Sequence, residues 1–322
     1  MSASFRRIDY SLRPAKHAER RMLCELYRRI TPFNRVEDYV YVGFGSILFL
    51  DFSLFHRALG IKNMISIERS ATAKKRIEEN KPFRIPVIYS HSKVVLPKLE
   101  WSKHHLLWLD YDDPLSPEML HDMQTVASRA KPGTVLTISV QCSIAPQVAE
   151  AESDKQADSP NALSRFISLF GRERVPQETD EMDLYSWRLG QLSRKMLSHE
   201  IEAGLAIRNS SSHENQMRFK QICEIEYEDG AKMTTLVGIF YSPEDAHLLD
   251  QCHFETLDFF PSSLKPIRIN VPKLSVRELK KLESQLPLGV GDELQIGNIP
   301  QSDADHFVSL YRYLPNFAVL EG

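Results

Sequence analysis

The sequence has few cysteines and no long apolar segment, and these absences exclude several classes of protein. Its 4 cysteines lie far apart and form no CxxC pair. This spacing argues against a zinc site and against a disulfide framework, and it favours a reducing compartment. The longest apolar runs, around Ile47–Leu50 and Leu106–Leu109, are far shorter than the roughly 18 residues of a membrane span. The first residues also lack the apolar stretch of a secretory signal. We therefore expect a cytoplasmic protein without a membrane contact.

Glycine, proline and net charge exclude further classes. The 13 glycines and 18 prolines are too few for a collagen-like or low-complexity chain. With 42% hydrophobic residues in 322, the chain can bury a core, so disorder is not its main state. Its 40 basic and 43 acidic residues give a net charge of −3, which argues against indiscriminate binding of polyanions. The length allows one large domain or two smaller ones.

Short apolar runs alternate with helical patterns through the first half of the chain. The runs, each predicted to be a strand, are 39–42, 64–67, 86–89, 106–109 and 135–140. The main helical patterns between them are 47–59, 71–80 and 116–130. Five apolar strands separated by helices are typical of βαβ units, in which helices cover both faces of a parallel sheet.

The second half changes character. Residues 145–161 are polar and acidic, and two helical patterns follow at 162–170 and 184–203. Phe219–Tyr227 and Thr234–Phe240 read as strands joined by a hairpin at Asp229-Gly230. An extended segment at 267–271 and helices from Ser275 and from Asp303 complete the chain. The predicted fold is α/β: a Rossmann-like, doubly wound, mostly parallel sheet that ends in an antiparallel hairpin, with a small C-terminal α/β appendage. We expect an N-terminal helix in 1–35, the sheet domain in 36–250 with an insertion at 143–215, and the appendage in 251–322.

The N-terminal segment is basic. Its first 30 residues contain eight Lys and Arg and three acidic residues, a local charge of +5. Apolar residues recur every three or four positions over Pro14–Ile30, with arginines between them, which predicts an amphipathic helix with a basic outer face. Such a face is either simply solvated or a contact for nucleic acid or phosphate.

The residues that end each predicted strand are the candidate site, because ligands bind at the carboxyl edge of an open parallel sheet. The first strand ends in Gly43-Phe-Gly45-Ser46, where glycines let the backbone approach a ligand. Glu68 ends the second strand 23 residues after Gly45, near the roughly 20-residue spacing of an acidic residue that binds ribose. The third ends in Ser90-His91-Ser92 and the fourth in Asp110-Tyr-Asp112. The pattern indicates a nucleoside-bearing ligand; the alternative is a glycine turn that only packs.

Several of these segments resemble the successive motifs of one enzyme family. The segments are YVYVGFGSILFLDF, MISIERS, VIYSHSKVVLPKL, LLWLDYDDPL and KPGTVLTIS. They resemble class I S-adenosylmethionine-dependent methyltransferases, in particular bacterial O-methyltransferases, over about residues 36–142. The hairpin at 219–240 fits the last two strands of that family.

The resemblance implies S-adenosyl-L-methionine as the cofactor and gives each strand end a role. Gly43 and Gly45, with Ser46 at the following turn, would pass beneath the methionine moiety, and Glu68 would hold the ribose. His91 and Ser92 would border the adenine. Asp110 would face the methyl donor and the acceptor.

The chain departs from that family at four places. Tyr41 stands where an acidic residue is common two before the first glycine, and Ile47 replaces the third glycine of the family. His91 stands where an aspartate often contacts the adenine. Metal-dependent members carry Asp-Asn after the fifth strand, and this chain has Val140-Gln141. No metal ligand is therefore predicted.

Methyl transfer from a sulfonium is an in-line displacement, to which the enzyme contributes mainly by positioning. If the acceptor is a hydroxyl, a general base assists, and Asp110 is the first candidate, with Asp112 or His91 second. In the alternative reading, Asp110 accepts hydrogen bonds from the N-terminus of the next helix. Asp51, in an apolar helical stretch, is either paired with an arginine or faces the ligand.

Three functions compete at this point. The first is an S-adenosylmethionine-dependent methyltransferase that acts on an oxygen, or a nitrogen, of an unidentified acceptor, either a small molecule or a nucleic acid. The second is a Rossmann-like subunit that binds a nucleotide or docks a protein partner, with little or no methyl transfer. The third is an NAD-dependent oxidoreductase, for which the third glycine is missing.

Overall fold

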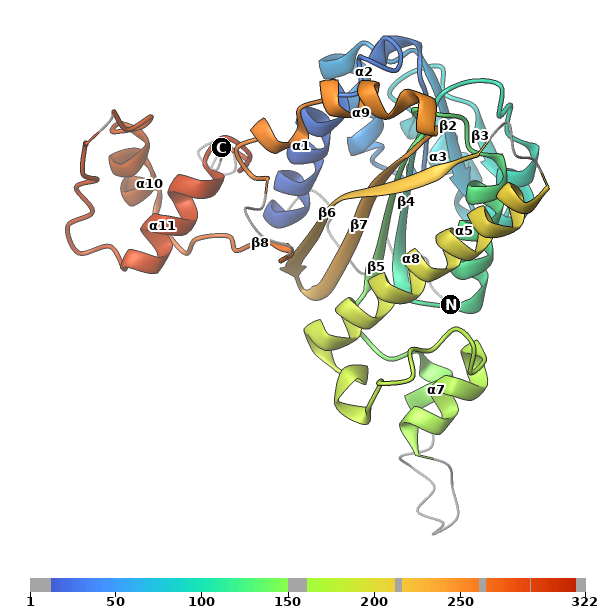
Figure 1. The fold of residues 1–322 in the computed structure, drawn as a ribbon. Coiled ribbons are helices and arrows are strands. Elements are labelled where there is room, and N and C mark those ends of the chain that lie inside the picture. The colour runs from blue at the N-terminus through green and yellow to red at the C-terminus, as the bar shows by residue number, and fades with distance from the viewer. Residues whose placement is uncertain (1–12, 150–160, 212–215, 261–264, 290, 317–322) are drawn as a thin grey trace.

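A mostly parallel sheet forms the centre of the molecule in the computed structural model (Figure 1), which describes residues 13–149, 161–211, 216–260, 265–289 and 291–316. Within these residues the sheet has eight strands in the order β3-β2-β1-β4-β5-β7-β6-β8. The strands are β1 Val40–Gly43, β2 Asn63–Glu68, β3 Val87–Tyr89, β4 His105–Pro114, β5 Val135–Gln141, β6 Arg218–Asp229, β7 Ala231–Tyr241 and β8 Ile267–Ile269. β7 is antiparallel to β5 and β6, and the other pairs are parallel. This topology confirms the predicted fold class.

Helices cover both faces of the sheet. One layer contains α1 Pro14–Arg28, α2 Leu50–Leu59 and α3 Lys74–Asn80, and the other contains α4 Ser92–Val95, α5 Pro117–Arg129 and α8 Ser186–Ser210. Successive strand residues point to opposite faces. Tyr41 therefore belongs to the α1–α2 core and Val42 to the α5–α8 core. By the same alternation, Asp110 lies on the α1 side with Trp108, and Tyr111 lies on the α5 side.

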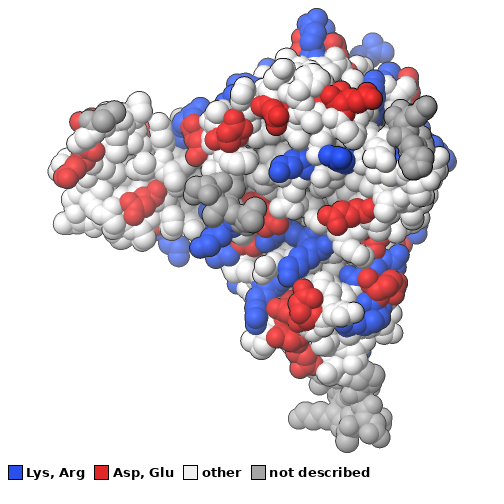
Figure 2. All heavy atoms as spheres, in the orientation of Figure 1, with Lys and Arg blue, Asp and Glu red and all other residues white. Residues whose placement is uncertain are grey.

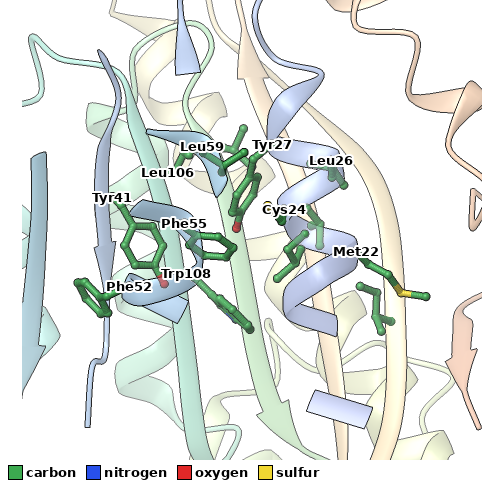
Figure 3. Close-up of a cluster of buried hydrophobic side chains, with 14 of the residues drawn as sticks. Met22, Cys24, Leu26, Tyr27, Tyr41, Phe52, Phe55, Leu59, Leu106 and Trp108 are labelled. Carbon is green, nitrogen blue, oxygen red and sulfur yellow. The ribbon is translucent and has the colours of Figure 1, made fainter. Parts of the chain in front are cut away.

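Aromatic side chains fill the space between the first two helices and the sheet. Figure 3 shows Tyr27 of α1, Phe55 of α2 and Trp108 of β4 gathered there. The rings of Tyr27 and Phe55 meet edge to face with centroids 5.3 Å apart. The Tyr27 hydroxyl shares a 2.9 Å hydrogen bond with Thr137 of β5, so this buried polar group is satisfied. α1 is thereby fixed to the centre of the sheet.

α1 begins at Pro14 as predicted, but its basic side chains lie differently from the prediction. Arg13, Lys16 and Arg20 are only 6%, 1% and 9% exposed, so the expected basic outer face is wrong for these three residues. Acidic side chains of the sheet attract them inward, as described below. Asp229, at the β6–β7 turn, accepts hydrogen bonds from the backbone N–H groups of Ala15 and Lys16 and so caps the helix.

The helix after the glycine turn starts later than predicted. It runs from Leu50, not from Ile47, because Ser46 and Phe49 adopt positive φ angles of 52° and 48°. This backbone turns the Phe49 ring inward, where it is completely buried. A Cβ on Gly45 would lie 2.3 Å from that ring, so glycine is required at position 45.

The C-terminal part has a small core of its own. α10 Val276–Glu283 and α11 Gln301–Leu310 enclose Leu282, Ile299 and Phe307, and Figure 1 shows these helices (red) extending from the main body. β8 connects this part to the sheet through β6. The remaining helices are the short α6 Pro146–Ala149, α7 Ala162–Phe170 and α9 Ala246–Gln251. The expected division at 36–250 and 251–322, and the insertion at 143–215, stay predictions.

The surface charge relates to the expected nucleic-acid contact, and the length and hydropathy of the helices relate to a possible membrane contact. Figure 2 shows basic and acidic side chains interspersed over the face drawn. In the described parts of the chain, no helix is long and apolar enough to span a membrane.

Candidate functional site

The carboxyl ends of β1, β2 and β4 lie side by side because β1 pairs with both of the other strands. Gly43 lies opposite Ser66 of β2 and Trp108 of β4. Glu68 and Asp110 each come two residues after these partners. The register therefore places Glu68 and Asp110 on either side of the Gly43–Gly45 turn, as the sequence pattern predicts for a ligand at this edge.

Glu68 is half-buried at the end of β2, with one carboxylate oxygen already used. Oε1 accepts a 2.8 Å hydrogen bond from the backbone N–H of Ser70. The backbone N–H of Arg69 also acts on this carboxylate and lowers its pKa. Burial raises the pKa of Glu68, and the Ser70 N–H partly opposes that shift.

The glycine turn is packed by neighbouring side chains of the same chain. A Cβ on Gly43 would lie 2.6 Å from the Tyr41 hydroxyl oxygen. That hydroxyl donates a hydrogen bond to Asp51 in the first turn of α2. Gly45 donates its own backbone N–H to Ser66 Oγ at 3.1 Å. The glycines thus make room for Tyr41 and Phe49 below the turn. The Ser46 hydroxyl is enclosed and has no hydrogen-bond partner among the described residues.

Asp110 is paired with a lysine that the sequence did not associate with it. Lys16 Nζ lies 2.6 Å from Asp110 Oδ1 and 2.7 Å from Glu19 Oε2. The same ammonium lies 4.4 Å from the ring centroid of Trp108. Burial on its own would raise the pKa of Asp110, but Lys16, with Arg20 and Arg13, outweighs it and holds that pKa below its ordinary value. A carboxylate so stabilised stays ionised and is a weak proton acceptor.

Asp112 follows two residues after Asp110 in β4. β4 continues to Pro114, beyond the predicted end at Leu109, with an irregularity between Asp110 and Pro114. Asp112 is therefore a half-buried strand residue and not part of a solvated loop. Its backbone carbonyl accepts a hydrogen bond from the side chain of Gln141. Its charge influences the pKa values of both Glu68 and Arg13, so it lies near both.

His91 and Ser92 follow β3, at the start of α4. His91 is exposed and precedes the first turn of that helix. The Ser92 hydroxyl donates to Asp122 of α5 at 2.5 Å, and the Tyr111 hydroxyl donates to the same oxygen at 2.6 Å. The Ser92 side chain therefore connects α4 to α5, which leaves its backbone and His91 at the edge of the sheet.

Two side chains at this edge were missed by reasoning from the sequence alone. Arg20 of α1 is buried, and its Nε has no hydrogen-bond partner among the described residues; the enclosed Tyr227 hydroxyl of β6 has none either. The charge of Arg20 helps to lower the pKa of Asp110, and the charge of Asp110 helps to raise the pKa of Tyr227. The sequence signal for Arg20 was the positive charge of the N-terminal helix. The recurrence of apolar residues every three or four positions, however, placed that charge on the outer face of the helix.

Within 13–149 and the other described ranges, no group of three or more His, Cys, Asp or Glu side chains is arranged to hold a metal ion. The edge does contain the half-buried carboxylate of Glu68 and an Asp110 whose pKa is held below its ordinary value.

A family model and solved structures match the chain. The model described as "Putative O-methyltransferase" matches residues 8–322. The fibrillarin pre-rRNA processing protein of Methanococcus jannaschii is 13% identical, with 66% of this chain and 69% of that chain covered and a TM-score of 0.36. The O-methyltransferase TomG of Streptomyces achromogenes is 12% identical, with 69% and 79% covered and a TM-score of 0.35. Among curated proteins, no match to the sequence was found.

Proposed function

Because the chain belongs to this O-methyltransferase family, we propose that it transfers a methyl group from S-adenosyl-L-methionine to an oxygen of a small-molecule acceptor. One observation carries the proposal: the pairing of β1 with β2 and β4 aligns Gly43–Gly45, Glu68 and Asp110 along one edge of the sheet. An adenosyl donor needs these elements close together, namely an open main chain, a ribose acceptor and an anion for its sulfonium.

Each residue at this edge then binds a particular part of the cofactor. Glu68 accepts hydrogen bonds from the two ribose hydroxyls, and its Oε1 is oriented by the backbone N–H of Ser70. Gly43, Gly45 and Ser46 carry the backbone beneath the methionine moiety, and His91 and Ser92 border the adenine.

Asp110 and Asp112 have different roles near the methyl group that is transferred. Asp110, kept ionised by Lys16, attracts the positively charged donor and orients it. This pairing makes Asp110 a poor base, so Asp112, two residues later in β4, is the better candidate to accept the acceptor's proton. The chain's contribution to the rate is chiefly the positioning of donor and acceptor in line.

A small acceptor fits the structure better than a nucleic acid. Lys16 and Arg20 of α1, and Arg13 just before it, act on Asp110 at the edge, and all three are buried. They are therefore not arranged to contact a phosphate backbone, which is bound by exposed cations. The four cysteines are buried and unpaired, which supports a reducing compartment such as the cytoplasm.

The proposal is tested by calorimetry with S-adenosylhomocysteine. We expect one site per chain in the wild type and an affinity about 10- to 100-fold lower in Glu68→Gln, because hydrogen bonds to a charged acceptor contribute about 1.5–3 kcal/mol. Glu79→Gln, an exposed site on α3, is the matched control and should bind like the wild type. Wild-type protein that fails to bind, or binding indifferent to Glu68, would refute the proposal.

A second candidate is a subunit that binds a nucleotide or a protein partner without methyl transfer. One observation favours it: a Cβ added at position 43 would meet the Tyr41 side chain, and one added at position 45 would meet the Phe49 ring, so the space beside the turn is filled. Mass spectrometry of the purified protein, for a co-purifying nucleoside, together with light scattering after size exclusion, for a bound partner, separates the two candidates.

A further inference from the structure

Lys232 is a half-buried cation at the start of β7. Its Nζ donates a 2.8 Å hydrogen bond to the Ser186 hydroxyl at the start of α8. Among the described residues, no carboxylate oxygen lies within 4.0 Å of this ammonium. Glu228 lies opposite Lys232 across the β6–β7 hairpin, but it is exposed and forms no ion pair with it. In the described part of the chain, the ammonium therefore has a neutral partner and no anionic one.

A second cation, Arg268 of β8, lies near Lys232 and does have an anionic partner. Its guanidinium donates to Glu226 Oε2 at 2.5 Å, and the other carboxylate oxygen of Glu226 accepts from Arg194. The indole ring of Trp187 packs against both cations, with its centroid 4.7 Å from the Arg268 guanidinium carbon and 5.3 Å from Lys232 Nζ. An aromatic face attracts a cation without neutralising its charge. Trp187 thus helps to position Lys232 and leaves its charge uncompensated.

Lys232 lies at the same edge of the sheet as the proposed donor site. β7 is antiparallel to β5, so its first residues lie beside the carboxyl end of β5. The Lys232 carbonyl accepts a 2.8 Å hydrogen bond from the backbone N–H of Cys142, which follows β5. Gln141, the last residue of β5, donates its side-chain amide to the backbone carbonyl of Asp112 in β4. Since neighbouring strands are about 4.8 Å apart, the backbones of Asp112 and Lys232 lie about 10 Å apart along the edge.

Apolar side chains are exposed beside Lys232. Met182 and Tyr185, which are 60% and 47% exposed, come just before Ser186. Figure 1 shows that the first residues of α8 lie near the β6–β7 turn. Binding sites for small molecules combine apolar side chains with a few polar groups that fix the orientation of the ligand. Met182, Tyr185 and Lys232 therefore suit a ligand that has an apolar body and an acidic group.

We propose that the methyl acceptor carries a carboxylate, which binds Lys232 beside Trp187, while the hydroxyl of the acceptor lies towards Asp112. This inference rests on the proposed function and adds the chemical class of the acceptor. One ammonium matches the single charge of a carboxylate better than the charge of about −1.5 to −2 on a phosphate monoester. The separation of about 10 Å between Asp112 and Lys232 fits one small molecule with its two groups at opposite ends.

The test uses two probes that differ only in charge, 3-(4-hydroxyphenyl)propanoate and its neutral amide. Their dissociation constants are measured by ligand-observed NMR titration, with and without saturating S-adenosylhomocysteine. The proteins are the wild type, Lys232→Met, Lys232→Arg and Lys220→Met. Lys220→Met is the matched control, because Lys220 is an exposed lysine of β6. The melting temperature of each variant shows whether it is folded.

We expect the wild type to bind the carboxylate about tenfold more tightly than the amide, because a hydrogen bond between charged groups is stronger than one to a neutral group. Lys232→Met should lose this preference by weakening the carboxylate alone. Lys232→Arg should keep most of the preference, and Lys220→Met should keep all of it. A lysine that served only the fold would instead lower the melting temperature when replaced and would weaken both probes equally.

Three results would overturn the inference. In the first, the wild type binds the two probes equally, or binds neither at about 10 mM. In the second, Lys232→Met keeps the preference for the carboxylate. In the third, Lys220→Met loses the preference as well, which means that any surface lysine contributes to it. If the wild type does not bind S-adenosylhomocysteine, the proposed function itself fails, and the titrations without that ligand show separately whether Lys232 binds a carboxylate.

Discussion

Replacing Lys16 with methionine should destabilise the protein strongly. Lys16 is 1% exposed, and its ammonium bridges Asp110 and Glu19 at 2.6 and 2.7 Å. Methionine has a similar length but no charge, so Glu19, which is 0% exposed, and the half-buried Asp110 would both lose their cation. Breaking a buried pair in this way typically costs about 3–5 kcal/mol, more than the pair itself contributes, because uncompensated charge stays behind.

The expected loss is measured by urea unfolding followed by circular dichroism. The free energy of unfolding falls with urea concentration at a slope of about 3 kcal/mol per molar for a chain of this size. A loss of about 3–5 kcal/mol therefore lowers the urea concentration at the midpoint of unfolding by roughly 1–1.7 M. Lys75→Met, on the exposed face of α3, is the control and should change stability by less than about 0.5 kcal/mol. Combining Lys16→Met with Glu19→Gln and Asp110→Asn removes all three charges and should recover most of the loss.

The loss should also depend on pH. In the wild type the pKa of Asp110 is held below its ordinary value, so its pairing stabilises the fold above the unfolded pKa of about 3.9 and is lost as pH falls through the lower folded value. In Lys16→Met the pKa of Asp110 rises. The difference in stability between the two proteins should therefore be largest at neutral pH and shrink in acid. A loss below about 1 kcal/mol at pH 7, or one that grows as pH falls, would refute this account of Lys16.

Three further substitutions test the packing around the site, each by the free energy of unfolding. Gly45→Ala places a methyl group 2.3 Å from the Phe49 ring and should cost about 1–3 kcal/mol; an unchanged stability would mean that the ring is not held there. Asp229→Ala removes the cap of α1 and should cost about 0.5–2 kcal/mol, with Glu228→Ala as the exposed control. Tyr27→Phe leaves the buried Thr137 hydroxyl without its partner and should cost about 1–3 kcal/mol, whereas a neutral effect would contradict the bond.

The strands of the sheet and the residues at its edge could be predicted from the sequence because both depend on local signals. Each strand is a short apolar run bounded by turn residues, and Gly43, Glu68 and Asp110 come directly at or after such runs. The Asp-Gly pair likewise marks the β6–β7 hairpin, where Gly230 has a φ of 91°. Once the strands are parallel, their carboxyl ends must meet at one edge.

The burial of the α1 charges could not be predicted, because it depends on distant partners. Helical periodicity assigns Lys16 and Arg20 to the polar side, and that side normally faces water. Here it faces Asp110, 94 residues away, so the polar side of the helix is covered by the sheet. The predicted start of α2 was wrong for a similar reason, because the Phe49 ring turns inward into the space that Gly45 leaves for it. Local patterns give the elements, and long-range charge and packing decide which face is inside.

The most direct test of the central claim is a crystal structure of the protein with S-adenosylhomocysteine. The account predicts the ribose hydroxyls on Glu68, the thioether sulfur beside Asp110 and the amino-acid end above the Gly43–Gly45 turn. An adenosyl group bound elsewhere on the chain, or no bound nucleoside at a saturating concentration, would contradict it.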